Sequence, residues 1–246
     1  FLYEEVRMSE EYAFPPYIEK AEEMIKEFGG TVMEEYRGYD IKPLWDQKGE
    51  GFTGFKYLYK APKIEKIAFG LGCFREKLMS YALIIWPDDE HALPVYSSYW
   101  AESAKGSFFI IDLYPLADCI RDLPYLEKYL APLEDIYAEG LEHFPPSNVR
   151  SMNWFRTVNS PYLITTEADA TKENQERLLN LTLDYLKVYI DLWKNEEPST
   201  PEYMKELNAR KEAIRKTFME RDSIGDMMLT KALGKELSHL SLITQF

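Results

Sequence analysis

Hydrophobic and polar residues alternate with two different periods along this chain, and the period changes near residue 115. An amphipathic segment at 15–29 opens with two prolines and closes with two glycines, which is typical of a helix. From about 31 to 114 the period is two, which predicts β-strands separated by Gly, Pro and charged turns. The expected strands are 31–36, 54–59, 67–71, 77–86, 95–100 and 107–113.

The second half of the chain has helical spacing. A helix is expected over 123–141, followed by a short strand near 161–166 and then the longest helix, 171–194, whose apolar residues recur every three or four positions. A further helix should run from Thr200 to about residue 220, and a final helix should begin after Asp222-Ser223. The apolar stripe of the longest helix is interpreted as core packing against the sheet.

Strands that follow one another without an intervening helix pair in the antiparallel sense. With helices before and after them, the pattern predicts an α/β fold: a three-layer α/β/α sandwich with a central, mainly antiparallel sheet flanked by helices. No repeat, low-complexity tract or long linker divides the chain, so we expect one domain over residues 1–246.

Composition narrows the function classes. The 18 Tyr, 13 Phe and 5 Trp residues indicate a folded globular protein, and no apolar run approaches the ~20 residues of a membrane span. A net charge of −13 argues against nucleic acid as a partner. Cys73 and Cys119 are isolated, so we expect reduced thiols and no metal site. With no secretory signal at the start, the expected location is the cytoplasm or an organelle stroma such as that of a plastid.

One short stretch is basic despite the overall charge. Residues 56–66 carry four lysines and one acidic residue; the lysines are Lys56, Lys60, Lys63 and Lys66. Such a strip can steer an acidic partner to the surface. Alternatively, the lysines protect a solvated strand edge from pairing with other chains.

The chain lacks the motifs of common enzyme classes: there is no GxSxG, no Gly-rich phosphate loop and no GxGxxG after a strand. It does contain an ordered series of fragments. They are Lys60-Ala61-Pro62-Lys63-Ile64, Leu93-Pro94-Val95-Tyr96, Ile110-Ile111-Asp112-Leu113-Tyr114-Pro115-Leu116, Ser160-Pro161-Tyr162-Leu163-Ile164, and the stretch from Arg221-Asp222 to Ala232-Leu233-Gly234-Lys235-Glu236. Together they resemble the ferredoxin-dependent bilin reductase superfamily, which also contains the red chlorophyll catabolite reductases.

The resemblance implies both a fold and an activity. Family members are α/β/α sandwiches that bind biliverdin or a related open-chain tetrapyrrole between the sheet and the C-terminal helices. They reduce it without a flavin or metal of their own, by single-electron steps from ferredoxin, or flavodoxin, coupled to protonation. The resemblance would make the lysine strip the ferredoxin dock.

Asp222 is the strongest candidate for a catalytic residue. From the sequence alone it either caps the following helix or points into a pocket. The resemblance implies a role in proton delivery to the bilin.

Two other positions depart from the family pattern. The position five residues after Pro94, where Asp is usual, is Tyr99, and the position five residues before Pro87, where Asp, Asn or His is usual, is Ala82. Tyr99 is expected to donate a proton or to pack against the substrate rings. Ser97, on the same strand face, adds a hydroxyl.

Other residues are candidates for the missing proton donor and for binding the propionates of a bilin. His91, in a turn, and Glu102, past a strand end, are possible replacement donors, although a surface His and a solvated Glu are the commoner cases. The propionates of a bilin call for Arg or Lys. Arg156 is the best candidate, with Arg150, Lys56 and Lys60 as alternatives.

Two rival functions stay open at this point. The stretch from Arg156 to Pro161 is similar to the branch that reduces a chlorophyll-derived open tetrapyrrole. The departures at Ala82 and Tyr99 also fit a bilin-binding or carrier protein without catalytic activity.

Overall fold

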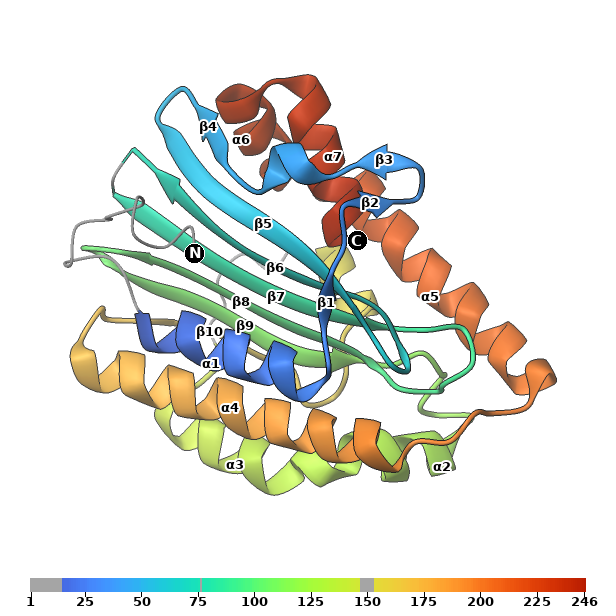
Figure 1. The fold of residues 1–246 in the computed structure, drawn as a ribbon. Coiled ribbons are helices and arrows are strands. Elements are labelled where there is room, and N and C mark those ends of the chain that lie inside the picture. Colours follow the sequence, from blue (N-terminus) through green and yellow to red (C-terminus); the bar gives the residue numbers. More distant parts are fainter. Residues whose placement is uncertain (1–14, 76, 147–152) are drawn as a thin grey trace.

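The computed structural model of the chain describes residues 15–75, 77–146 and 153–246. Its centre is an eight-stranded sheet in which every neighbouring pair of strands is antiparallel (Figure 1). The path is β1-β5-β6-β7-β8-β9-β10, with β4 also paired to β5. The strands are β1 Thr31–Val32, β4 Gln47–Gly49, β5 Phe52–Ala61, β6 Ile64–Phe74, β7 Leu78–Pro87, β8 Val95–Ser103, β9 Gly106–Tyr114 and β10 Ile164–Ala168. A separate two-stranded ribbon joins β2 Glu35–Tyr36 to β3 Tyr39–Asp40.

Helices cover both faces of this sheet. On one face lie α1 (Pro15–Glu27), α3 (Glu134–His143) and α4 (Lys172–Asn195), and on the other α5 (Pro201–Arg221), α6 (Ser223–Leu233) and α7 (Lys235–Gln245) (Figure 1). Among the described residues, no helix is long and apolar enough to cross a membrane. The three-layer sandwich predicted from the sequence is confirmed.

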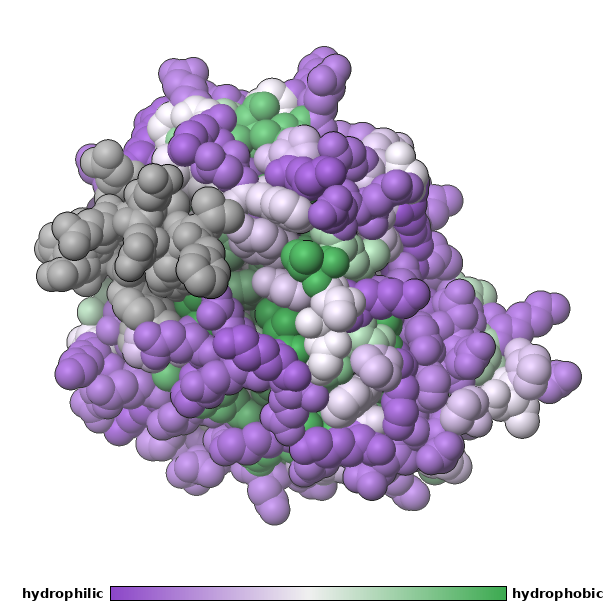
Figure 2. All heavy atoms as spheres, viewed as in Figure 1, coloured by the Kyte–Doolittle hydropathy of each residue, from purple (hydrophilic) through white to green (hydrophobic). Residues whose placement is uncertain are grey.

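The amphipathic pattern places the core where it was expected. On α4, Leu178, Tyr185 and Tyr189 are completely buried, and the Tyr189 ring lies 5.8 Å from that of Tyr96 on β8. Hydrophilic residues cover most of the face shown in Figure 2, with smaller hydrophobic areas between them. The stripe on α4 is therefore core packing, as interpreted.

Two segments that were each expected to form a single helix are divided in the structure. The segment 123–141 is divided into α2 (Leu123–Tyr125), a π-helical turn (Leu126–Leu130), a 3₁₀ turn (Ala131–Leu133) and α3, because Pro132 cannot donate a backbone hydrogen bond. The final helix is split into α6 and α7 at Gly234, whose φ of 81° lies in the left-handed region that favours glycine. Strand β2 lies within the expected strand 31–36, whereas β3 and β4 were not expected from the sequence.

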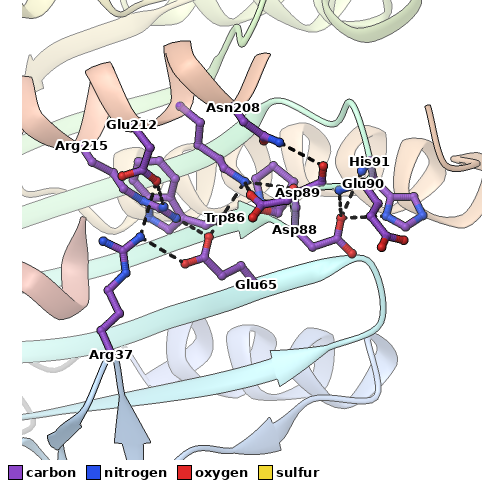
Figure 3. Close-up of polar contacts among 12 residues, drawn as sticks. Arg37, Glu65, Trp86, Asp88, Asp89, Glu90, His91, Asn208, Glu212 and Arg215 are labelled. Carbon is purple, nitrogen blue, oxygen red and sulfur yellow. Dashed lines mark hydrogen bonds and ion pairs between the residues drawn. The ribbon is translucent and has the colours of Figure 1, made fainter. Parts of the chain in front are cut away.

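An ionic network fastens α5 to the sheet (Figure 3). Arg215 on α5 donates to Glu65 on β6 and to Glu212, and its guanidinium lies 4.4 Å from the centre of a Trp86 ring. Burial raises the pKa of Glu65, but the Arg215 charge and hydrogen bonds from Arg215 and Tyr36 outweigh it, so the pKa is lowered. The network therefore holds Glu65 ionised against the helix.

A buried lysine continues this attachment toward the β7–β8 loop. Lys211 is completely buried and donates to the carbonyl oxygens of Pro87 and Asp88 and to the Asp89 carboxylate, at 3.1, 3.0 and 2.6 Å. Asn208, one turn earlier, donates to the Asp89 carbonyl oxygen at 3.0 Å. Because α5 ends directly before Asp222, these contacts also fix where that residue lies.

Candidate functional site

A cavity of about 500 Å³ lies between the sheet and the C-terminal helices. Its floor is formed by residues of β5 to β10, and its walls come from α5, α6, α7 and the 3₁₀ turn Asn153–Thr157. Most lining side chains are apolar or aromatic. Within the described part of the chain, the charged residues of the lining are Lys56, Glu167 and Asp222. A largely apolar cleft with few polar groups suits a flat, conjugated organic ligand.

Directly paired residues place one row of side chains across the cavity floor. Lys56 pairs with Gly70, Gly70 with Ala82, and Ala82 with Tyr99. Residues paired directly in an antiparallel sheet present their side chains to the same face. The row, called here the floor row, is thus small in the middle and bears an amine at one end and a phenol at the other.

Asp222 combines the two roles that the sequence left open. Its carboxylate accepts a hydrogen bond from the Gly225 backbone N–H at 3.1 Å, which caps α6, and the residue lines the cavity. Burial raises the pKa of the carboxyl group, the Gly225 N–H opposes that shift, and the Asp226 charge adds to it. A half-buried carboxyl with a raised pKa is suited to holding and releasing a proton.

Tyr99 on β8 lines the same cavity as Asp222. Burial raises the pKa of its phenol to about 12, with a contribution from the Asp222 charge and an opposing hydrogen bond with Ser80. The phenol is therefore fully protonated near neutral pH and is a poor acid. Its ring lies 6.3 Å from that of Phe108, edge to face.

Ala82 and Ser97 also line the cavity, and contact between them and a substrate stays a prediction. Ala82 contributes a methyl group next to Tyr99. Ser97 is buried, and its Oγ accepts a hydrogen bond from the Tyr114 hydroxyl at 3.0 Å. Neither residue supplies an acid.

Arg156, the best candidate for binding a propionate, is not among the residues that line the cavity. It is exposed, although its neighbours Trp154 and Phe155 line the cavity. Arg150 lies outside the described residues. Contact between Arg156 and a propionate stays a prediction.

The four lysines do not form one exposed strip, which corrects that expectation. Lys66 is completely buried and donates to the Ile243 carbonyl oxygen at 3.2 Å. Lys56 is buried too, and donates to Ser241 of α7. Lys63 donates to the carbonyl oxygens of Trp193 and Glu196 at 3.0 and 2.5 Å, which leaves Lys60 as the exposed member. The lysines do not form an exposed strip because α7 covers the face of β5 and β6 that bears Lys56 and Lys66.

The replacement donors lie away from the cavity. His91 is buried rather than on the surface, and its Nδ1 lies 2.8 Å from an oxygen of Asp88. Glu102 is also buried rather than solvated, and it accepts hydrogen bonds from Ser107 at 3.1 Å and from Gln175 on α4 at 2.6 Å. Both side chains are committed to structural contacts.

Sequence reasoning missed Asp112, which joins two of the motif fragments. This completely buried carboxylate accepts hydrogen bonds from the Ser160 hydroxyl, from the Ser160 N–H at 2.8 Å and from Asn159 at 3.1 Å. Burial raises its pKa to about 6, against these hydrogen bonds. The contact fixes the segment after the turn that supplies Trp154 and Phe155 to the cavity. A buried Asp in an otherwise apolar strand was the available signal.

Comparisons with known proteins identify the family and the fold. A family model described as ferredoxin-dependent bilin reductase matches residues 41–246. Phycoerythrobilin:ferredoxin oxidoreductase of Gloeobacter violaceus is 24% identical over 199 residues, which cover 76% of this chain and 75% of that protein. The crystal structure of tomato phytochromobilin synthase in complex with biliverdin is similar with a TM-score of 0.79 at 18% identity, over 93% of this chain and 83% of that one.

The structural likeness establishes the fold, and the family match spans most of the chain. The cavity also lies between the sheet and the C-terminal helices, where the resemblance places the bilin. This chain belongs to the ferredoxin-dependent bilin reductase family and is an oxidoreductase of that family.

Proposed function

We propose that this protein reduces a biliverdin-type linear tetrapyrrole in the cavity between the sheet and α5–α7. Electrons come one at a time from reduced ferredoxin, or flavodoxin, and no flavin or metal is resident. The observation that carries the proposal is Asp222, a carboxyl of raised pKa on the wall of an aromatic-rich cavity. Tyr99 packs against the rings or assists in proton delivery, and Arg156 lies near a propionate.

The proposal extends to organisation and location. Residues 1–246 form one domain, which is supported by the packing of α1 on the sheet outside the family match: the Tyr17 hydroxyl lies 2.8 Å from Ser98 Oγ. The protein acts in the cytoplasm or an organelle stroma, a location that fits a sequence with only two cysteines, Cys73 and Cys119, far apart in the chain.

Lys60 is the exposed part of the proposed ferredoxin dock, together with the partly exposed Lys63. Reversing both charges should raise the apparent KM for ferredoxin, because opposite charge speeds the encounter with an acidic partner. An unchanged KM would remove this docking site while leaving the reaction untouched.

The reaction is tested by absorption spectroscopy in two steps. Biliverdin added to the protein should give a shifted absorption band, and reduced ferredoxin added afterwards should change the spectrum again. A shifted band that does not respond to ferredoxin would indicate the bilin-binding protein without catalysis, which the side chains of Ala82 and Tyr99 favour. Parallel reactions with a chlorophyll-derived open tetrapyrrole distinguish the other branch, and no response to either pigment would refute the proposal.

A further inference from the structure

One buried titratable group in the cavity has no part in the function proposed above. Lys56 lines the cavity, and within the described part of the chain it is the basic residue of that lining. Its Nζ lies 2.8 Å from both the carbonyl oxygen and the hydroxyl oxygen of Ser241, which lines the same cavity. An ammonium group has three N–H donors, so one is left for a ligand.

The residues that follow Lys56 in the floor row have small side chains. Gly70, which pairs with Lys56, carries no side chain; an added Cβ there would come within 3.3 Å of Lys56 Cβ. The next residue in the row, Ala82, adds only a methyl group. Three strand spacings of ~4.8 Å separate Lys56 from Tyr99, roughly 14 Å.

On the basis of the proposed function, we propose that Lys56 is a second proton donor to the tetrapyrrole, serving in place of the polar side chain missing at Ala82. Reduction of one double bond takes two electrons and two protons. Two reduced ferredoxins supply one electron each, Asp222 supplies one proton, and Lys56 supplies the other. The two new bonds to hydrogen form on the tetrapyrrole, and Lys56 is left as a neutral amine that regains its proton from water.

The surroundings of Lys56 make its proton available. Burial lowers the pKa of the amine to about 7. The other titratable residues that line the cavity are Tyr99, Tyr114, Glu167 and Asp222. Lys66 on β6 interacts electrostatically with Lys56, and the titratable residues of α7 (Lys235, Glu236 and His239) are exposed. Among the described residues, no carboxylate forms an ion pair with Lys56, and two acceptors at the C-terminal half of α7 hold it in place. A general acid acts best when its pKa lies near the working pH.

The test uses two variants at this position and one control. Lys56→Arg keeps the positive charge but does not release a proton, and Lys56→Met removes both. Lys66→Met is the matched control, because Lys66 is the neighbouring buried lysine that also donates to α7 but does not line the cavity. Biliverdin binding is titrated first, and single-turnover reduction with reduced ferredoxin is then followed from pH 6 to 9.

The wild-type rate should fall as the pH rises through about 7, because only the ammonium form donates. Lys56→Arg should bind biliverdin within about threefold of wild type yet reduce it ~100-fold more slowly, without that step in its pH profile. Lys66→Met should keep the step. Since Asp222 also loses its proton as pH rises, the step must persist in Asp222→Asn.

A Lys56→Arg protein with the wild-type rate and pH profile would overturn this inference and leave the proposed function intact. A wild type that does not reduce biliverdin would refute both. If the Lys56 variants do not fold, the wild-type and Asp222→Asn profiles decide: a rate that stays flat between pH 6 and 8 overturns the inference.

Discussion

Replacing Asp222 separates its structural role from its chemical one. Asp222→Asn keeps a side-chain oxygen that can accept the Gly225 N–H, but it removes the acid. Asp222→Ala removes both. The pair therefore forms a matched set in which only one variant loses the cap of α6.

The structure sets the size of each effect. Loss of a helix N-cap costs about 1 kcal/mol, which lowers Tm by ~2–4 °C in a protein of this size. Loss of a general acid lowers a rate by ~10²–10⁴, equivalent to about 3–5 kcal/mol in the barrier. Asp222→Asn should thus melt within about 1 °C of wild type and reduce biliverdin at least ~100-fold more slowly.

The pH dependence of stability gives an independent check. Burial raises the pKa of Asp222 in the folded protein, so the folded carboxyl binds its proton more tightly than the unfolded one. The stability that the group contributes is then fully present at pH values below the ordinary pKa of a carboxyl group. It is lost as the pH rises from that ordinary pKa through the raised pKa of the folded protein. Asp222→Asn lacks this loss and should match or exceed the wild-type Tm near neutral pH.

Thermal melts from pH 4 to 8 and single-turnover reduction at pH 7 measure these quantities. The reasoning fails if Asp222→Asn reduces biliverdin at the wild-type rate. It also fails if both variants lose activity only in proportion to their loss of folded protein, because that result would make Asp222 a cap alone.

Three further predictions concern the surroundings of the site. Tyr99→Phe should keep the single-turnover rate within about threefold, because a phenol with a pKa of about 12 is a weak acid; a ~100-fold loss would make Tyr99 a donor. Glu65→Gln should lower the free energy of unfolding by about 2 kcal/mol in urea at pH 7, since the buried Arg215 loses the less exposed of its two carboxylate partners. The pKa of Glu65 is lowered in the folded protein, so this difference should shrink as the pH falls from the ordinary carboxyl range through the lowered pKa, and a difference that does not change with pH would contradict the ion pair. Gly234→Ala should cost about 1 kcal/mol in thermal melts because φ is 81° there, and a gain in stability would refute that strain.

Strands and long helices could be predicted from the sequence because their periods are set by local geometry. The elements that cover each face of the sheet could not be predicted in this way. Lys56 occupies an inward position of β5, in the alternation Phe52, Gly54, Lys56, Leu58, and all four are buried. Counting lysines along the chain predicted an exposed strip, whereas the alternation alone already indicated a buried amine. Only the path of α7 across this face shows which acceptors hold it.

The polar contacts of the core could not be predicted from the sequence for a related reason. Asp112 and Ser160 are 48 residues apart, and each belongs to a fragment that was noted for its resemblance alone. Glu102 was likewise expected past a strand end, but it lies within β8 and accepts a hydrogen bond from Gln175 on α4. Such partners meet only because antiparallel pairing and helix packing bring distant segments together, and the docking of a helix on a sheet is not encoded in a local pattern.

The floor row explains how a family member can lack polar side chains at its centre. With Gly70 and Ala82 in the middle, the floor offers a flat surface for conjugated rings, and the groups able to carry protons lie at its edges. Asp222 is held on the helical wall by α5, whose own position depends on the buried Arg215 and Lys211. If the proposed function is correct, protons reach the tetrapyrrole from Asp222 on the helical wall and from Lys56 at the end of the floor row, not from the middle of that row. The contacts that anchor α5 and α7 therefore set the distance between proton donors and rings, and loosening either helix should slow reduction more than it weakens binding.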